Sequence, residues 1–305
     1  MRRRPILVLA SLGFVLLSGR TEAYVRTQTS TGIFVAWKNP CIEMRFMLGA
    51  PPPLLTADQY LAAAQHAAAV WSHDEVACSD LRLTVVADPA ADAITGNDHQ
   101  NMIVFRQDTW CPRGDAAVGC YPANALAITT VWKNKQTGEI PDADIEINAV
   151  TTTAGTGFQW ADIASQPGAG IDFQNMLTHE LGHVLGFSHN CYTPSDSVPS
   201  LVDHTGAATL SCYGGTLPAE VAEATMFPSV DRSDISRRTL SPDDQQAVCD
   251  VYPYTHDACP IPAPPSTGGC SLAPASPVAG HGVAPWLVLV GIGWLGRRKN
   301  KGLTR

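Results

Sequence analysis

The chain has 305 residues and a formal net charge of −8. Residues 24–269 hold 11 basic and 27 acidic side chains, so this part alone has a net charge of −16 and is long enough for one large domain or two small ones. An acidic surface repels phosphate backbones, so the composition excludes nucleic acid as a partner and is compatible with solubility outside the cell.

The first 23 residues have the pattern of a secretory signal peptide. Three arginines at residues 2–4 are followed by an apolar run at residues 6–17, and "TEA" precedes Tyr24. The apolar run is too short to span a bilayer comfortably, and small side chains are typical of the cleavage site. We therefore expect residues 1–23 to be removed on export. An N-terminal membrane anchor is the alternative.

Local patterns predict five strands and two helices besides the one that carries the main motif. β-Branched, aromatic or alternating stretches predict strands at residues 33–37, 81–86, 101–106, 125–132 and 143–148. Thr56 can cap an alanine-rich helix in which apolar residues recur at helical spacing. Ser241, Pro242 and the acids that follow predict the start of a second helix.

The stretch "DADIEIN" (residues 142–148) alternates acidic or polar with apolar side chains. In a strand, Asp142, Asp144 and Glu146 would share one face. Because Ca²⁺ takes oxygen ligands, these carboxylates could contribute to a structural calcium site. The alternative is that they form the solvated face of the strand.

The stretch "MLTHELGHVLGFSHN" (residues 176–190) holds three histidines and a glutamate. Asp172 can cap a helix through this stretch, on which His179 and His183 lie one turn apart on the same face. Gly186 can end the helix, because glycine tolerates left-handed backbone angles. The turn that follows would bring His189 round to the same place.

Three imidazole nitrogens in this arrangement predict a catalytic zinc site. They would leave the fourth tetrahedral position open, and zinc lowers the pKa of water there to about 7. Glu180 would be close enough to take the proton from that water. The spacing H-E-x-x-H-x-x-G-x-x-H fixes five positions, and a chance match is on the order of one in ten thousand or rarer.

On this motif the sequence resembles the metzincin metalloproteases, in which a methionine-containing turn lies beneath the zinc. "EATMFPSV" places Met226 to serve as that turn, and Met226-Phe227-Pro228 is similar to the Met-aromatic-Pro of the matrixin branch. "LSPDDQQAVCDVYP" also looks like the matrixin C-terminal helix. The resemblance covers roughly residues 37–252.

The resemblance implies an α+β catalytic domain, which we place at residues 24–258. It implies a mixed, mostly parallel twisted sheet, an active-site helix and a C-terminal helix, with Glu180 as general base. It also implies that one Zn²⁺ is held by His179, His183 and His189. "DADIEIN" resembles the matrixin edge strand, so a protein or peptide substrate would pair with Ile145, Glu146, Ile147 and Asn148. We expect a monomer.

Two features depart from the matrixin pattern. Met226 lies 37 residues after His189, farther than in typical matrixins, and the stretch between them contains Cys191, His204 and Cys212. An insertion here would reshape the rim of the cleft, so the substrate preference stays open, and His204 could approach the cleft. Strand-like sequence starts soon after the signal peptide, so we expect no matrixin-like propeptide.

Eight of the nine cysteines precede Cys270, and an even number in an exported chain predicts disulfides. The plausible local pairs are Cys111–Cys120, Cys191–Cys212 and Cys249–Cys259, which leaves Cys41–Cys78. Eight cysteines allow 105 pairings, so the connectivity stays open. A cysteine-rich zinc site is the alternative, although the chain has no CxxC pair.

The C-terminal stretch predicts a linker at residues 259–269 and a sorting or anchor segment at residues 270–305. Proline and glycine are dense in "CPIPAPPSTGGCSLAPASP" and build no core. The "GGC", the apolar run at residues 283–295 and the basic residues 297–299 together resemble bacterial MYXO-CTERM sorting tails. This implies surface delivery with cleavage near Cys270, and membrane contact through the tail alone. A single-pass anchor is the alternative.

These patterns predict a secreted, surface-attached zinc endopeptidase, and two other hypotheses stay open. One is a catalytically silent binding module of the same fold, against which the intact Glu180 counts. The other is a surface adhesin, suggested by the tail and by Arg113-Gly114-Asp115, the integrin-binding tripeptide. That tripeptide is short enough to arise by chance, here within a loop that Cys111 and Cys120 would close.

Overall fold

A five-stranded sheet forms the centre of the computed structural model, which describes residues 24–90, 95–151, 157–193, 202–255 and 259. The strands are β2 (Cys41–Met47), β3 (Arg82–Asp88), β4 (Met102–Arg106), β5 (Ala127–Trp132) and β6 (Asp142–Asn148). Their order across the sheet is β3-β2-β4-β6-β5, and only β5 runs antiparallel to its neighbour. The prediction of a mixed, mostly parallel sheet is confirmed.

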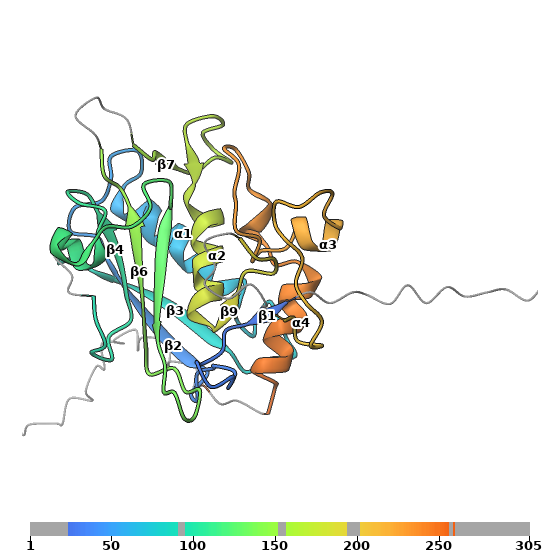
Figure 1. Cartoon of the computed structure of the whole chain (residues 1–305). Coiled ribbons are helices and arrows are strands. Elements are labelled where there is room, and N and C mark those ends of the chain that lie inside the picture. Colours follow the sequence, from blue (N-terminus) through green and yellow to red (C-terminus); the bar gives the residue numbers. More distant parts are fainter. Residues whose placement is uncertain (1–23, 91–94, 152–156, 194–201, 256–258, 260–305) are drawn as a thin grey trace, which may run out of the picture. The chain divides into compact units, whose positions relative to one another are not determined.

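Helices α1 (Ala57–Ala69) and α2 (Phe173–Val184) pack on the sheet and on each other (Figure 1). α1 begins where the sequence predicts, because Thr56 and Gln59 exchange side-chain to backbone hydrogen bonds in a capping box. Both helices join one hydrophobic core with inward strand residues such as Ile145. The buried Trp71 donates from Nε1 to the Thr178 carbonyl at 2.9 Å and so ties the end of α1 to α2.

Shorter elements surround this core. Two small sheets pair β1 (Val25–Arg26) with β9 (Phe187–Ser188) and β7 (Trp160–Ala161) with β8 (Ile171–Asp172). The remaining helices are η1 (Pro112–Gly114), η2 (Ala116–Val118), α3 (Ala219–Ala222), η3 (Ser236–Arg238) and α4 (Pro242–Val251). The start predicted for α4 is confirmed, since Ser241 Oγ accepts a hydrogen bond from the Asp244 backbone N–H.

The sequence prediction is wrong for the first strand. Residues 33–37 form no strand, because Phe34 and Ala36 each make only a single bridge to other segments. The first long strand is β2, "CIEMRFM", in which Ile42, Met44 and Phe46 are buried while the side chains between them are more exposed. This alternation is the pattern of a half-buried strand, and it outweighs the β-branched content of residues 33–37.

The acidic face of β6 is buried, so the alternative of a solvated face is wrong. Asp142 accepts hydrogen bonds from the backbone of residues 98 and 99 at 2.6 and 2.7 Å. Asp144 accepts from the backbone of residues 96 and 102 at 2.7 and 2.9 Å, and Glu146 pairs with Arg106. The segment at residues 95–102 therefore folds over these carboxylates and supplies N–H donors to them. Calcium binding here stays a prediction.

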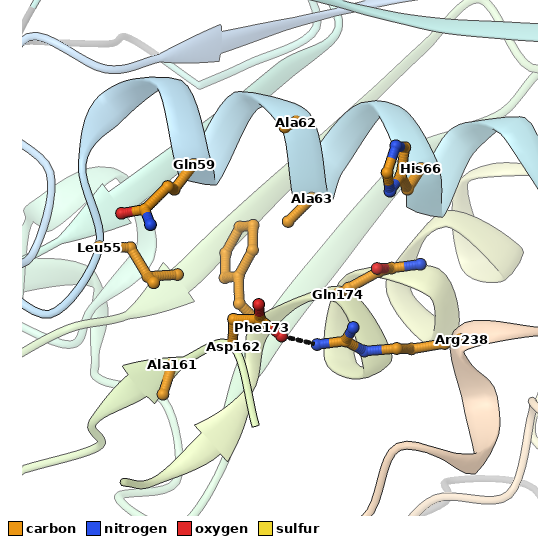
Figure 2. A pocket seen from close by; sticks show the side chains of 10 residues that line it. All are labelled: Leu55, Gln59, Ala62, Ala63, His66, Ala161, Asp162, Phe173, Gln174 and Arg238. Carbon is orange, nitrogen blue, oxygen red and sulfur yellow. Dashed lines mark hydrogen bonds and ion pairs between the residues drawn. The ribbon is translucent and has the colours of Figure 1, made fainter. Parts of the chain in front are cut away.

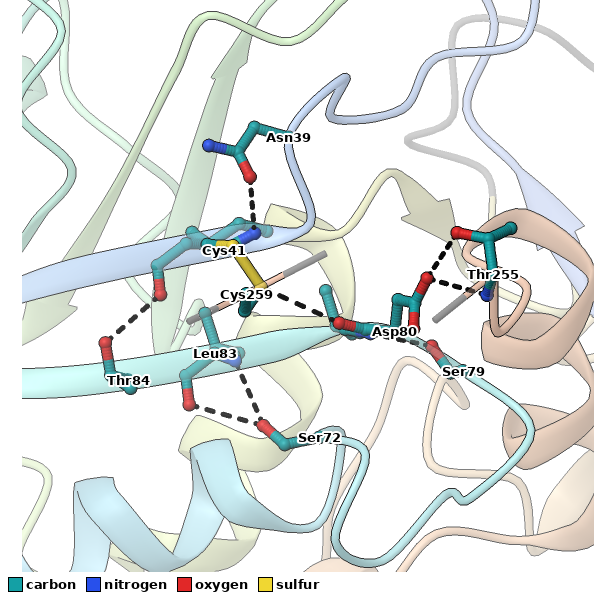
Figure 3. Close-up of a disulfide and its surroundings, with 11 residues drawn as sticks. Asn39, Cys41, Ser72, Ser79, Asp80, Leu83, Thr84, Thr255 and Cys259 are labelled. Carbon is teal, nitrogen blue, oxygen red and sulfur yellow. Dashed lines mark hydrogen bonds between the residues drawn. A yellow bond between two sulfur atoms is a disulfide. The ribbon is translucent and has the colours of Figure 1, made fainter. Parts of the chain in front are cut away.

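Four disulfides join eight of the nine cysteines, and two of the pairs differ from those expected. Cys111–Cys120 and Cys191–Cys212 are confirmed. The pairs Cys41–Cys78 and Cys249–Cys259 are wrong, because the bonds are Cys41–Cys259 and Cys78–Cys249. The chain after α4 returns to the start of β2 and β3, where Asp80 accepts hydrogen bonds from Thr255 (Figure 3). Four disulfides are typical of an extracellular protein.

The two predicted end segments lie outside the described residues. They are the signal peptide at residues 1–23 and the tail at residues 270–305, and most of the linker lies outside as well. Within the described part of the chain, no helix has the length and apolar character needed to cross a membrane.

Candidate metal centre

α2 carries the first two histidines of the candidate centre, and both of its ends are fixed by local contacts. At the start, Asp172 accepts a hydrogen bond from the Asn175 N–H at 2.8 Å and one from Arg238 Nε at 2.9 Å. At the end, Gly186 has a φ of 89°. A Cβ at Gly186 would lie 2.9 Å from the Val35 carbonyl oxygen, so glycine is required there both for its backbone angle and for space.

The turn at Gly186 brings the third histidine back to the helix. The nearest ring nitrogens of His179, His183 and His189 all lie within 4.8 Å of one another. His183 Nε2 and His189 Nε2 are 3.2 Å apart. Two nitrogen ligands of one tetrahedral zinc, each about 2.0–2.1 Å from it, are roughly 3.3 Å apart. The pair His183 and His189 therefore has the spacing of two ligands of one such ion, and His179 lies close enough to complete the group.

Backbone carbonyls fix the orientation of two of the rings. His179 Nδ1 lies 2.7 Å from the Thr225 carbonyl oxygen, and His183 Nδ1 lies 2.8 Å from the Phe187 carbonyl oxygen. A carbonyl only accepts hydrogen bonds, so Nδ1 carries a proton in both rings. In the neutral form of such a ring Nε2 keeps its lone pair, which is the form that binds a metal.

The surroundings keep the rings of His179 and His189 neutral. Burial lowers the pKa of His179 well below its ordinary value and lowers the pKa of His189 to about 3. The charges of His183 and Arg237 act in the same direction on both groups. Unprotonated imidazoles at neutral pH are what a metal ion requires.

Glu180 lies beside this cluster with 7 % of its surface exposed. Its Oε2 accepts a hydrogen bond from Thr129 Oγ1 at 2.5 Å. Burial raises the pKa of Glu180, while His183 and the hydrogen bond from Thr129 oppose that rise. A carboxylate with a raised pKa accepts a proton more readily than an exposed one, which suits a general base. Sequence reasoning missed Thr129, which is 51 residues away along the chain.

Met226 packs directly against α2 at Gly182, the residue before His183. It is 2 % exposed, and a Cβ placed on Gly182 would lie 2.3 Å from its Sδ. The absence of a side chain at Gly182 thus lets the methionine approach the helix closely. The preceding residue, Thr225, supplies the carbonyl that holds His179. The segment expected to form the methionine turn therefore contacts the candidate centre.

The expectation that substrate pairs with Ile145, Glu146, Ile147 and Asn148 is wrong. These residues belong to β6, which is bonded to β4 on one side and to β5 on the other. A strand with both edges paired has no free backbone groups for a peptide. The edge strand on this side of the sheet is β5, and it lies next to α2.

Two other features from the sequence lie outside the cluster. His204 stacks on the Tyr24 ring, with 4.1 Å between the ring centroids, and its backbone N–H bonds to the Tyr24 carbonyl. Arg113-Gly114-Asp115 lies in the loop that the Cys111–Cys120 disulfide closes. Neither is brought to the three histidines.

A cavity of about 260 Å³ lies among α1, the start of α2 and η3, and none of its lining residues belongs to the histidine cluster (Figure 2). Its one guanidinium, from Arg238, pairs with Asp162 and with Asp172, the residue that caps α2. Arg238 therefore bridges two carboxylates, and its contact with Asp172 helps to hold the start of the helix.

Comparisons with known proteins add little to this geometry. No protein-family model matches the chain, and no curated protein matches it either. One solved structure, described as "Structure of Myroilysin", is 15% identical and covers 72% of this chain and 82% of its own, with a TM-score of 0.32. A likeness this low carries no argument about fold or activity.

Proposed function

We propose that the protein is a zinc-dependent endopeptidase with a metzincin, matrixin-like fold. The observation that carries this proposal is the convergence of three histidines beside the buried carboxylate of Glu180. A binding module needs no proton acceptor at a metal site, whereas hydrolysis does. Secretion, surface attachment through residues 270–305 and a monomeric state are part of the same proposal.

His179, His183 and His189 are the residues that would hold one zinc ion. When bound, zinc supplies Lewis acidity, which polarises a peptide carbonyl and makes water a stronger acid. The protein's part is to present three oriented nitrogens, two of which are aligned by the carbonyls of Thr225 and Phe187. Such partners of ligating histidines contribute to metal affinity.

Glu180 performs the proton transfers in this proposal. Its carboxylate takes a proton from the attacking water and passes it to the nitrogen of the leaving amine. The nitrogen needs that proton because an amide anion is a poor leaving group. Burial of Glu180 favours this role, since it raises the pKa of the carboxyl.

β5 is the strand that we propose receives the peptide. The Asn148 N–H donates to the Leu126 carbonyl, which marks these opposite residues as a hydrogen-bonded pair. In an antiparallel ladder such pairs alternate with non-hydrogen-bonded pairs, whose backbone N–H and C=O groups point away from the partner strand. The backbone groups of Ala127, Thr129 and Val131 therefore face the free edge, where an extended substrate adds as a further strand.

Glu180→Gln tests the proposal, because it keeps the size of the side chain and removes its basic oxygen. We expect zinc to stay bound and hydrolysis of casein to fall by about 10²–10⁴-fold. His183→Ala should lose both zinc and activity. Glu223→Gln, at an exposed position, is the matched control and should behave as wild type. The measurements are metal analysis and the rate of casein hydrolysis.

Two outcomes would contradict the proposal. If Glu180→Gln cleaves casein at the wild-type rate, Glu180 is not the base. If the wild type binds zinc but cleaves nothing in a broad peptide library, the silent binding module replaces the enzyme. Cell adhesion that survives removal of zinc would instead favour the adhesin.

A further inference from the structure

We propose that Thr129 is a positioning residue for Glu180, so that the strand that receives the substrate also sets the orientation of the base. This inference rests on the proposed function. It assigns a role to a residue outside the histidine motif, and it predicts that peptide binding along β5 affects the chemical step as well as affinity.

The first support is the position of Thr129 in its strand. Side chains alternate along β5, and Ala127 and Val131 belong to or pack against the core that contains α2. Thr129 lies between them on the same face, and its hydroxyl reaches Glu180. An apolar residue would suit this row of the strand. The one polar side-chain atom in this row, Thr129 Oγ1, lies where it contacts the carboxylate of Glu180.

The second support is that Glu180 has few other restraints. Its side chain has three rotatable bonds. Among the described residues, the Thr129 hydroxyl is the one side chain that donates a hydrogen bond to its carboxylate, at 2.5 Å. One oxygen, Oε2, is thus held in place. Holding a base within a narrow range of positions increases the rate of proton transfer.

The third support is that the side chain and the backbone of Thr129 face different parts of the site. Its hydroxyl contacts Glu180, while its backbone N–H and C=O face the free edge of the sheet, as the pairing of Leu126 with Asn148 indicates. A peptide bonded to that edge would fix the backbone of Thr129. The hydroxyl, and through it the carboxylate, would then be fixed as well.

Thr129→Val provides the test, because valine has nearly the same shape and lacks the hydroxyl. We expect kcat on a peptide substrate to fall by about 10- to 100-fold, the range for loss of a hydrogen bond to a charged group, while KM and zinc content change less than about 2-fold. Thr129→Ser should restore kcat to within about 3-fold of wild type. Thr130→Val, on the opposite face of the strand, should behave as wild type.

A double substitution separates positioning from damage to the strand. If Thr129 acts through Glu180, adding Thr129→Val to Glu180→Gln causes no further loss of kcat. An equal loss in both backgrounds would overturn the proposal, as would a wild-type kcat for Thr129→Val or a failure of Thr129→Ser to restore it. Should Thr129→Val not fold, the comparison of Thr129→Ala with Thr129→Ser decides in the same way.

If the wild type cleaves no peptide, the proposed function fails, and this inference fails with it. An active wild type beside a fully active Thr129→Val overturns the positioning role alone.

Discussion

Asp144 has a carboxyl group that is almost fully covered, with 1 % of the residue exposed. Burial raises its pKa to about 7, even though the N–H groups of residues 96 and 102 oppose the rise. In an unfolded chain the pKa of an aspartate is about 3.9. The folded protein therefore binds a proton at Asp144 more tightly than the unfolded chain does.

This difference makes stability depend on pH. The contribution of Asp144 is fully present below about pH 4 and is lost as the pH rises through about 7. Asp144→Asn does not titrate, so between pH 5 and 8 the wild type should lose up to a few kcal/mol of unfolding free energy relative to the variant. Urea denaturation at several pH values measures this, with exposed Asp74→Asn as control. Parallel pH profiles for wild type and Asp144→Asn would show that Asp144 does not titrate as described.

Within the described part of the chain, strand β5 has one free edge, so its two sets of backbone groups can be tested separately. Val131→Pro removes an N–H that faces the free edge, so the ladder to β6 should survive and kcat/KM for peptides should fall by about 2- to 10-fold. Thr130→Pro removes an N–H that faces β6, so it should destabilise the strand. Steady-state kinetics and thermal melting distinguish the two. A Val131→Pro enzyme with unchanged kcat/KM would place the substrate elsewhere.

At the scale of single elements, the sequence predicted the features that depend on residues close together in the chain. Thr56, Asp172 and Ser241 each cap a helix by accepting a hydrogen bond from an N–H three residues later, so these helix starts could be predicted. The histidine spacing is likewise local, because one helix and one turn bring the three rings together.

Contacts between distant segments could not be predicted in this way. The sequence does not show which strand of the β5–β6 hairpin forms the edge of the sheet. The edge strand is β5, because β6 pairs with β4. Thr129 reaches Glu180 from another strand, and no pattern in its own surroundings marks it. The burial of Asp142 and Asp144 results from a loop that folds over them, whereas alternation in the sequence shows only that they share a face.

At the scale of the whole molecule, two disulfides connect the beginning of the described chain with its end. Cys41 bonds to Cys259 and Cys78 to Cys249, so both bridges span most of the sequence. We expect thiol titration of unfolded, unreduced residues 24–269 to find no free cysteine. Peptide mapping without reductant should recover these two pairs. Removing either bridge should cost roughly 2–5 kcal/mol of stability. Two or more free thiols would refute the scheme.

The proposed endopeptidase activity gives the long bridge from Cys41 to Cys259 a further consequence, because a protease can cleave other copies of itself. A single cut anywhere between these two cysteines leaves both pieces covalently joined. Autolysis at an exposed loop would thus yield a nicked molecule of unchanged mass apart from one added water. Such a molecule would migrate with the intact protein on a gel run without reductant and separate into fragments once the disulfides are reduced.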